Sequence, residues 1–426
     1  MKHLYLLLIP ILFLSGGSGF SAEVSLSEIL VKAEKFSHLL SAAQLNETAA
    51  RANVGLARSD YFPTLDFEAV DSTGFAASSN LSGITGIPGS PYRKGASLGA
   101  VSRINIWDFG RTFYSTESAS YEANVEKYRS QITEAEVDLE AAKTFFDCVR
   151  TKTQMENWQI ILDQARVVSE EVQKYIATGQ RSVVDKYLSE SQVEEAFTQK
   201  ADFEKKSDLE ARQLSILTGI DYAEISCPIL SKLSKIDASA ISDNGKNPDV
   251  LVATEQAHAE EARASHAKAE RLPKLFAGAS AGIMQDVRLV REKNYSIGIG
   301  LEIPLFEVKA YYKIKRAEAL SSGRQFLIEA AKERVDQTNA KYDKIILSSQ
   351  ARLEHLQNEL KLAEEGFQIA KRRYFKFQGT LVDVRETLRN LTRTRIQIDD
   401  SQIDFMEASA AKILFNGRTS ILKEGK

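Results

Sequence analysis

The chain contains an internal duplication, and this feature constrains its fold more than any other. Residues 38–65 align without a gap with residues 248–275. Six positions in this alignment are identical: Ala43/Ala253, Ala49/Ala259, Ala52/Ala262, Ala57/Ala267, Pro63/Pro273 and Leu65/Leu275. A second pair of matching segments begins at Ser97 and at Ser296. A sequence repeated in this way predicts two similar structural units.

Both copies predict the same order of elements: a helix, two strands joined by a loop, a very long helix, a turn and a returning helix. The opening helices are expected at residues 26–60 and 249–271. Each stops before a proline, Pro63 or Pro273, because proline interrupts helices. The sequence therefore divides into a first structural repeat, a linker and a second structural repeat: residues 23–220, 221–247 and 248–426.

The long helices are the largest elements that the sequence predicts. They are expected at residues 110–178 and 308–376, and shorter helices return at 183–218 and 383–415. At ~1.5 Å per residue, each long helix is on the order of 100 Å in length. Apolar residues recur at steps of three and four, as they do from Tyr121 to Val149. This heptad spacing is typical of helices that pack against neighbouring helices.

Four short segments alternate between apolar and polar residues, as strands with two different faces do. They lie around residues 65–69, 98–106, 275–283 and 295–305, and their polar faces are mostly small and rich in glycine. Their length is that of a tilted strand that crosses a bilayer. A soluble sandwich with one wet face is the alternative interpretation.

Residues 1–22 have the pattern of a secretory signal peptide. Lys2 precedes an apolar run from Leu4 to Leu14 that is too short to span a bilayer, and small residues follow it. No later apolar run is long enough to predict a transmembrane helix. After export, Cys148 and Cys227 would meet an oxidising compartment. They could form a disulfide, but two buried free thiols are the favoured interpretation.

Composition and charge exclude several classes of function. The net charge is −3 with acidic and basic residues interspersed, so nothing favours nucleic acid as a partner. His258 and His266 share a helix but do not have the spacing of a zinc-binding helix. No catalytic grouping or phosphate-binding loop is evident. The sequence therefore predicts no enzyme activity, no metal site and no cofactor.

Four strands are too few to close a barrel, which makes assembly necessary. An open sheet edge in lipid leaves backbone groups unpaired, at several kcal/mol for each group. Two copies would give eight strands, a barrel that its own side chains fill, whereas three copies give twelve strands and room for a pore. The predicted fold is mainly α-helical with a small membrane β-barrel. It is a homotrimer, with a 12-stranded barrel on a tunnel of 12 helices.

Several segments resemble one known family. The run Ile104-Asn105-Ile106-Trp107-Asp108-Phe109-Gly110-Arg111 resembles the strand-to-helix junction of TolC-like outer membrane efflux proteins. Tyr61-Phe62-Pro63-Thr64-Leu65 and Asn247-Pro248 are also similar to family segments, and the helix-turn-helix tips match as well. The resemblance covers almost the whole mature chain. It implies a trimeric barrel in outer membrane lipid, and a tunnel through the periplasm of a Gram-negative cell. It also implies that the tunnel's entrance docks a periplasmic adaptor protein and an inner-membrane pump.

The turns at the helix tips are the candidate functional site. Gly179 and Gly379 are expected to provide the turn geometry between antiparallel helices. Asp383 and Glu386 are three positions apart, so both carboxylates lie on one helix face. Acids at a helix start are also favoured by the helix dipole alone, which is the simpler interpretation. The resemblance implies that Asp383 and Glu386 form the periplasmic entrance constriction.

The same resemblance implies a gate at the tips. A tyrosine matching Tyr374 and an aspartate matching Asp185 help to hold the entrance closed in the family. The arginine that completes this latch falls on Gly379 when the alignment starts from Asp383. When Gly379 and Thr380 are aligned instead, the turn has lost two residues. Both alignments predict an incomplete latch, with a closed state that is looser or held differently.

The predicted function is that of an outer-membrane channel protomer. The channel would be the exit duct of a tripartite efflux system or of a type I secretion system. The alternative, from another class, is a non-conducting periplasmic coiled-coil scaffold of the cell envelope. The residues do not distinguish drug, metal, peptide or protein as cargo.

Overall fold

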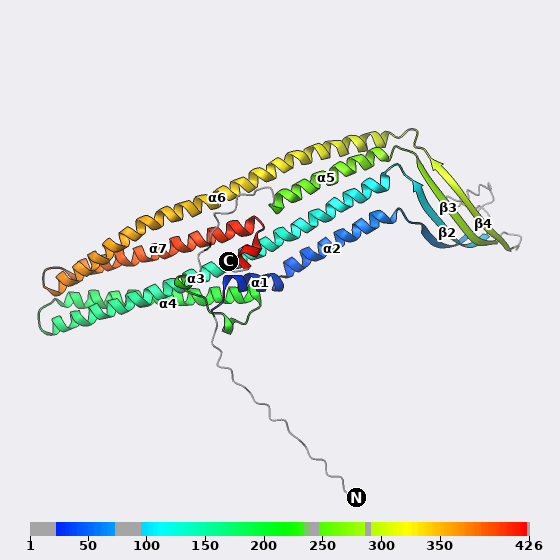
Figure 1. The fold of residues 1–426 in the computed structure, drawn as a ribbon. Coiled ribbons are helices and arrows are strands. Elements are labelled where there is room, and N and C mark those ends of the chain that lie inside the picture. Colours follow the sequence, from blue (N-terminus) through cyan, green and yellow to red (C-terminus); the bar gives the residue numbers. More distant parts are fainter. Residues whose placement is uncertain (1–22, 73–94, 234–235, 237–246, 286–290, 424–426) are drawn as a thin grey trace, which may run out of the picture.

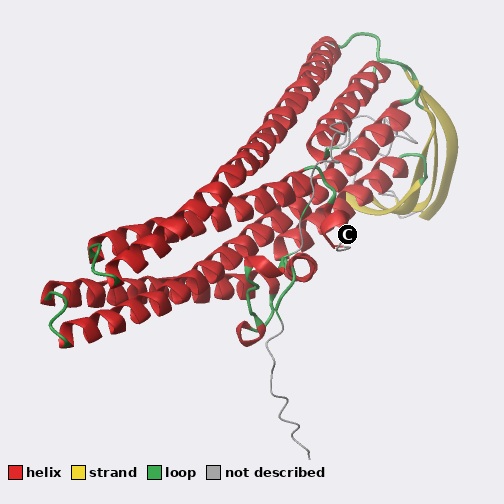
Figure 2. Ribbon diagram, turned by 60° about the vertical axis from the view of Figure 1, so that its left-hand side comes forward, coloured by secondary structure: helices red, strands yellow, loops and turns green. Residues whose placement is uncertain are grey.

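The computed structural model describes residues 23–72, 95–233, 236, 247–285 and 291–423. The predicted signal peptide and residues 234–235 and 237–246 of the predicted linker lie outside these described residues. The chain is elongated, with the strands at one end and the turns of the helical hairpins at the other (Figures 1 and 2). The prediction of a mainly helical fold is confirmed.

The elements follow the predicted order twice. The first half contains α1 (Leu26–Phe36), α2 (His38–Ser59), β1 (Thr64–Ser72), β2 (Gly95–Trp107), α3 (Arg111–Ala177) and α4 (Val183–Thr218). Two short 3₁₀ helices follow, η1 (Tyr222–Glu224) and η2 (Leu230–Lys232). The second half contains α5 (Pro248–Ala269), β3 (Lys274–Gln285), β4 (Arg291–Glu302), α6 (Val308–Phe375), α7 (Leu381–Phe415) and α8 (Thr419–Lys423). The residue bounds that the sequence gives to the two repeats stay a prediction.

The opening helix of the first half is interrupted at Ser37, so the prediction of one helix over 26–60 is wrong. The Ser37 N–H donates to the Ala33 carbonyl and ends α1. Its side-chain oxygen accepts a hydrogen bond from the Leu40 N–H at 3.1 Å and starts α2. Serine serves both roles because its short side chain competes with the backbone for hydrogen bonds at helix ends.

The four strands form one antiparallel sheet in the order β1-β2-β3-β4. One face carries the predicted apolar residues, and those of β4 are strongly exposed, with Ile297 at 85% and Ile299 at 72%. The opposite face carries Asp66, Glu68 and Arg103 on β1 and β2 and is mostly small on β3 and β4. There a hydrogen bond of 2.7 Å joins the hydroxyls of Ser280 and Ser296. Strands β1 and β4 are the two edges of the sheet.

Strand β4 ends at Glu302, three residues earlier than the sequence predicts. Its partner Lys274 is the first residue of β3, so no further residue of β3 can pair with it. Pro304 also lacks a backbone N–H to continue a ladder. Residues up to Leu305 therefore belong to the connection to α6.

The junction between β2 and α3 is held by side chains of the Asp108–Arg111 run. Asp108 Oδ2 accepts a hydrogen bond from the Thr112 N–H at 2.8 Å, and Oδ1 accepts one from Gly110 at 3.1 Å. Although burial opposes it, these hydrogen bonds lower the pKa of Asp108. Arg111 donates to the carbonyls of Ala269 at 3.1 Å and Glu270 at 2.8 Å, at the end of α5. It also donates to Leu272 beyond that end. Arg111 therefore joins the start of α3 to the end of α5.

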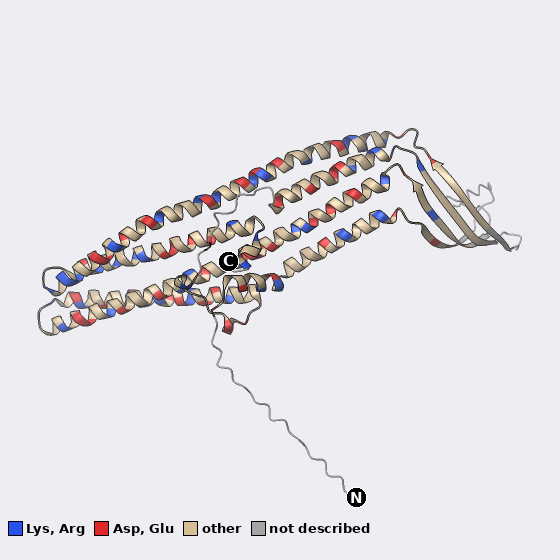
Figure 3. Cartoon of the chain, in the orientation of Figure 1, with Lys and Arg blue, Asp and Glu red and all other residues tan. Residues whose placement is uncertain are grey.

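The largest apolar core lies midway between the strands and the hairpin turns of the folded molecule, where α1, α3, α4, α7 and α8 meet (Figure 1). Its fully buried members include Ile29, Phe145, Leu214 and Ile413. Charged residues occur along all the long helices and are sparser on the sheet (Figure 3). None of the helices in the described ranges is long and apolar enough to cross a membrane.

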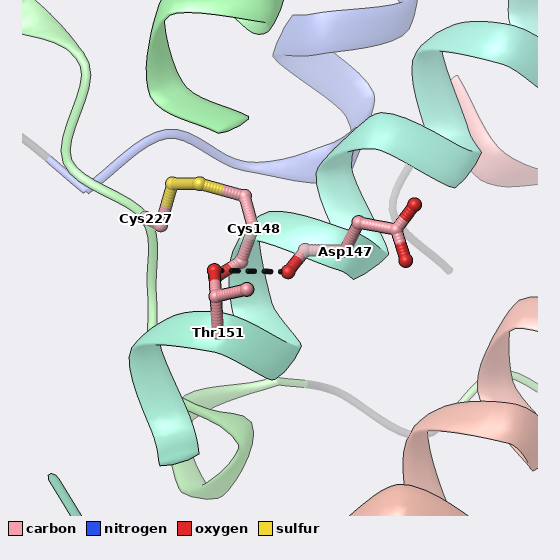
Figure 4. Close-up of a disulfide and its surroundings, with 4 residues drawn as sticks. All are labelled: Asp147, Cys148, Thr151 and Cys227. Carbon is pink, nitrogen blue, oxygen red and sulfur yellow. Dashed lines mark hydrogen bonds between the residues drawn. A yellow bond between two sulfur atoms is a disulfide. The ribbon is translucent and has the colours of Figure 1, made fainter. Parts of the chain in front are cut away.

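A disulfide joins Cys148 of α3 to Cys227 of the linker within this core (Figure 4). The favoured interpretation of two free thiols is therefore wrong. Their Cα atoms lie 5.9 Å apart, within the range that a disulfide requires. Sequence spacing does not reveal such a distance, because the two residues are 79 positions apart. Nearby, the Leu230 N–H donates to Thr153 Oγ1 at 3.1 Å, which also fixes the linker to α3.

Candidate functional site: the hairpin tips

The turn between α3 and α4 forms at a glycine, as the sequence predicts. Gly179 has a φ of 73°, a left-handed conformation that suits glycine, and its N–H donates to the Ile176 carbonyl at 2.9 Å. Ser182 then starts α4, because its side chain accepts a hydrogen bond from the Val184 N–H at 3.2 Å. The first turn is therefore built by local hydrogen bonds.

The turn between α6 and α7 is built differently from the prediction. The left-handed residue is Phe377, with a φ of 61°, whereas Gly379 does not have a positive φ. A Cβ atom at Gly379 would lie 3.3 Å from the Cβ of Arg373. Gly379 thus allows close approach of the chain to the end of α6, and it does not supply the turn conformation.

Asp383 has a local structural role. Thr380 and Asp383 form a capping box at the start of α7, in which Asp383 Oδ2 accepts the Thr380 N–H at 3.0 Å. Hydrogen bonds from the Thr380 backbone and side chain lower the pKa of Asp383. The simpler interpretation, a favourable charge at a helix start, therefore applies to Asp383. It does not account for Glu386, which lies one turn later, and both side chains are exposed.

Tyr374 and Asp185 are brought together from the two hairpins. The Tyr374 hydroxyl donates to Asp185 Oδ2 at 2.9 Å, although the residues are 189 positions apart. Tyr374 is fully buried. Burial, followed by the hydrogen bond and the charge of Asp185, raises the pKa of Tyr374. The tyrosine is therefore a neutral donor at physiological pH, and its hydrogen bond joins α6 to α4.

Arg181 is the residue of this site that sequence reasoning missed. Its guanidinium carbon lies 4.0 Å from the centroid of the Tyr374 ring and 5.1 Å from that of Phe377. It also donates to the backbone carbonyl of Tyr374. The family resemblance places the latch arginine in the α6–α7 turn, at Gly379, whereas Arg181 lies in the α3–α4 turn. Its position two residues after Gly179 was the available signal.

Aromatic and aliphatic side chains fill the space between the two hairpins. Tyr175 stacks against Phe375 with ring centroids 5.7 Å apart, and it meets Phe377 edge-on at 5.4 Å. Behind these rings, a separate apolar cluster includes residues of α3, α6 and α7: Val168, Val172, Ala363, Phe367, Tyr374, Leu381, Val384, Leu388 and Leu391. This arrangement holds the two hairpins side by side.

The comparisons with known proteins agree with this architecture. A family model described as "Outer membrane efflux protein" matches residues 29–219 and 244–411. The fold is similar to that of the outer membrane protein VceC from Vibrio cholerae, with a TM-score of 0.79 and 17% identity. That match covers 92% of this chain and 96% of VceC.

Two other solved structures are similar over most of their length. The CmeC outer membrane channel of Campylobacter jejuni has a TM-score of 0.77 at 16% identity, covering 92% of this chain and 86% of CmeC. The MtrE outer membrane channel of Neisseria gonorrhoeae, in its open state, has a TM-score of 0.75 at 17% identity. That match covers 92% of this chain and 88% of MtrE. Comparison with curated protein sequences finds no match.

Proposed function

The chain belongs to the outer membrane efflux protein family, and on that premise we propose that three copies form an exit duct through the cell envelope. Membership places the protein in the outer membrane and among channel proteins, not enzymes. The proposal adds the trimer, the closed 12-stranded barrel and the tunnel of 12 helices. It also adds the partners, which are a periplasmic adaptor protein and an inner-membrane pump.

The observation that carries this proposal is the sheet with two free edges. Among the described residues of the protomer, β1 pairs only with β2 and β4 pairs only with β3. The face bearing Leu65, Phe67 and Ile297 is exposed, which is costly in water and favourable against lipid. A sheet with an apolar face and open edges is satisfied in lipid when β4 of one copy pairs with β1 of the next.

The length of the helices supports a duct that reaches far from the sheet. Helices α3 and α6 have 67 and 68 residues, so each spans on the order of 100 Å. Both run from the strands to the hairpin tips (Figure 1). With the sheet in the outer membrane, the tips would lie deep in the periplasm, where a partner in the inner membrane can reach them.

The first test concerns assembly and conduction together. Protein extracted in mild detergent is expected to have the mass of a trimer, because a lone protomer leaves two sheet edges unpaired. The same trimer should give discrete conductance steps in a planar bilayer. A folded monomer would contradict the barrel, and a trimer that never conducts would support the non-conducting envelope scaffold instead.

We infer further that Tyr374, Asp185 and Arg181 act as a latch at the entrance. Tyr374 and Asp185 join the two hairpins, and Arg181 covers the Tyr374 ring and binds its carbonyl. These contacts lie within one protomer at the end of the tunnel. Separation of the hairpins would break all of them at once, so they favour the closed arrangement.

Tyr374→Phe is expected to raise the open probability of the channel. A hydrogen bond to a charged group contributes about 1.5–3 kcal/mol, so its loss should shift the closed–open equilibrium by roughly tenfold or more. Single-channel recording measures this shift. Tyr187→Phe, at an exposed tyrosine of α4, is the matched control and should leave the open probability unchanged. Equal open probability in Tyr374→Phe and the original channel would show that this contact is not a latch.

A tripartite efflux system and a type I secretion system are the two kinds of machinery that such a duct can serve. Drug efflux and type I secretion use the same kind of duct, and the described residues do not favour one cargo. Identification of the copurifying inner-membrane protein after mild crosslinking would separate them.

A further inference from the structure

Four charged side chains from three helices meet beside the apolar core, far from the tips. Lys423 of α8 donates hydrogen bonds to Glu34 of α1 and, at 3.2 Å, to Glu134 of α3. Its Nζ also lies 3.6 Å from Asp138 Oδ2, one turn further along α3. One carboxylate oxygen from each of the three acids lies within 4.8 Å of the other two. The acid triad of Glu34, Glu134 and Asp138 thus surrounds a single ammonium group.

Asp138 shows that this triad is not fully satisfied. Its side chain is 0% exposed, and neither carboxylate oxygen has a hydrogen-bond partner among the described residues. A buried carboxyl group without hydrogen-bond donors is costly, and the one ammonium nearby, that of Lys423, lies 3.6 Å away, beyond hydrogen-bond distance. The buried carboxyl group of Asp138 therefore lacks a hydrogen-bond donor in the described structure.

The spacing of the acid triad suits one calcium ion. Ca²⁺ binds carboxylate oxygens at about 2.4 Å, so two oxygens on one ion lie at most about 4.8 Å apart. The three oxygens meet this limit. Ca²⁺ also accepts irregular geometry and completes its shell with water, which the partly exposed Glu34 and Glu134 allow. A divalent ion would bring twice the charge of the ammonium that now lies there.

We propose that the acid triad is a divalent-cation site whose internal competitor is Lys423, so that ion binding and docking of α8 exclude each other. Helix α8 has five residues, and its described anchors are Lys423 and the buried Leu422. When Ca²⁺ occupies the triad, the Lys423 ammonium is displaced into solvent and α8 loses its ionic anchor. Linkage is reciprocal, so the factor by which Ca²⁺ weakens the docking of α8 equals the factor by which docking of α8 weakens Ca²⁺ binding.

The first experiment measures Ca²⁺ binding to the full chain in detergent by calorimetry. Lys423→Met keeps the length of the side chain and removes the competing charge. We expect it to bind one Ca²⁺ per protomer at least about tenfold more tightly than the original protein. Adding Asp138→Asn to this variant should abolish the gain. Equal affinity in Lys423→Met and in the double variant would overturn the proposal.

A matched control uses a second lysine–carboxylate pair. Lys412 Nζ lies 2.7 Å from Asp343 Oδ1, between α7 and α6, and Lys412 is as buried as many core residues. It has a single carboxylate partner in the described structure and not three. Lys412→Met should therefore create no Ca²⁺ site. A gain equal to that of Lys423→Met would show that any unpaired acid on this surface binds the ion, which would also overturn the proposal.

The second experiment follows α8 in the original protein and does not depend on the lysine variant. A nitroxide attached at Ser420→Cys, an exposed position of α8, reports the motion of this helix. The two native cysteines are joined in a disulfide and would not react with the label. Saturating Ca²⁺ is expected to increase the label's mobility, and chelation should reverse it. Asp138→Asn should not respond. An unchanged spectrum in the original protein at saturating Ca²⁺ would overturn the competition between ion and helix.

Discussion

Reduction of the Cys148–Cys227 disulfide should lower the free energy of unfolding by about 4 kcal/mol, because the bond closes a long loop in the unfolded chain. The two cysteines are 79 positions apart, and the closed loop contains α4 and the start of the linker. The reduced chain should therefore unfold at a lower denaturant concentration, with the change followed by circular dichroism. Both cysteines are buried, so the measurement needs a reductant that acts under mildly denaturing conditions.

The Cys148→Ala, Cys227→Ala double variant provides the control for this result. It should unfold at the lower denaturant concentration whether or not reductant is present. If reduction leaves the unfolding midpoint of the original protein unchanged, the disulfide contributes nothing to stability. In that case the contact between Leu230 and Thr153, with the surrounding core, would be sufficient to hold the linker.

Asp383→Asn combined with Glu386→Gln should remove block of the channel by multivalent cations applied from the tip side. Three protomers would bring six of these carboxylates to one constriction. Attraction grows with the charge of the ion, so a potential that concentrates potassium about fivefold would concentrate a trivalent ion by roughly a hundredfold. Single-channel current should therefore be blocked by a trivalent cation such as hexaamminecobalt and not by potassium. The double variant should weaken this block by roughly a hundredfold.

The capping box allows the charge of Asp383 to be removed without moving the start of α7. Asparagine at position 383 keeps an oxygen that can accept the Thr380 N–H, so α7 should still start at the same residue. Asp202→Asn with Glu204→Gln removes the same charge from exposed positions of α4 and should leave the block intact. If the tip variant is blocked as strongly as the original channel, the two acids are only helix-start charges and the constriction lies elsewhere.

The order of elements could be predicted from the sequence because it depends on local patterns. Period-two alternation places Ile297 and Ile299 on one face of β4, and the heptads of α3 and α6 specify helices of nearly equal length. The break at Ser37 was missed, because a single serine can stand inside a helix or end one. The outcome there depends on α1 packing Ile29 and Leu30 into a distant core.

The contacts of the candidate site were only partly predictable. Tyr374 and Asp185 were paired through the family resemblance, whereas Arg181 was not found because it comes from the other turn. The acid triad could not be found from spacing at all, since Lys423 and Glu34 are 389 positions apart. Long-range side-chain contacts leave no periodic signal in a sequence. Only the folded arrangement of α1, α3 and α8 brings them together.

The hydrogen bonds of Arg111 to the end of α5 show how the two halves of a duplicated chain have become different. When the copies are aligned through Trp107 and Phe306, Arg111 corresponds to Ala310 of α6. Arg111 fastens α3 to the end of α5, so the joint between the two halves of one protomer is tied by a guanidinium group. In the proposed ring, Ala310 would occupy the equivalent joint between neighbouring protomers and cannot make that tie. The ring would then contain three interfaces with this arginine contact and three interfaces without it. The interfaces without it would form last during assembly and would separate first under mechanical stress.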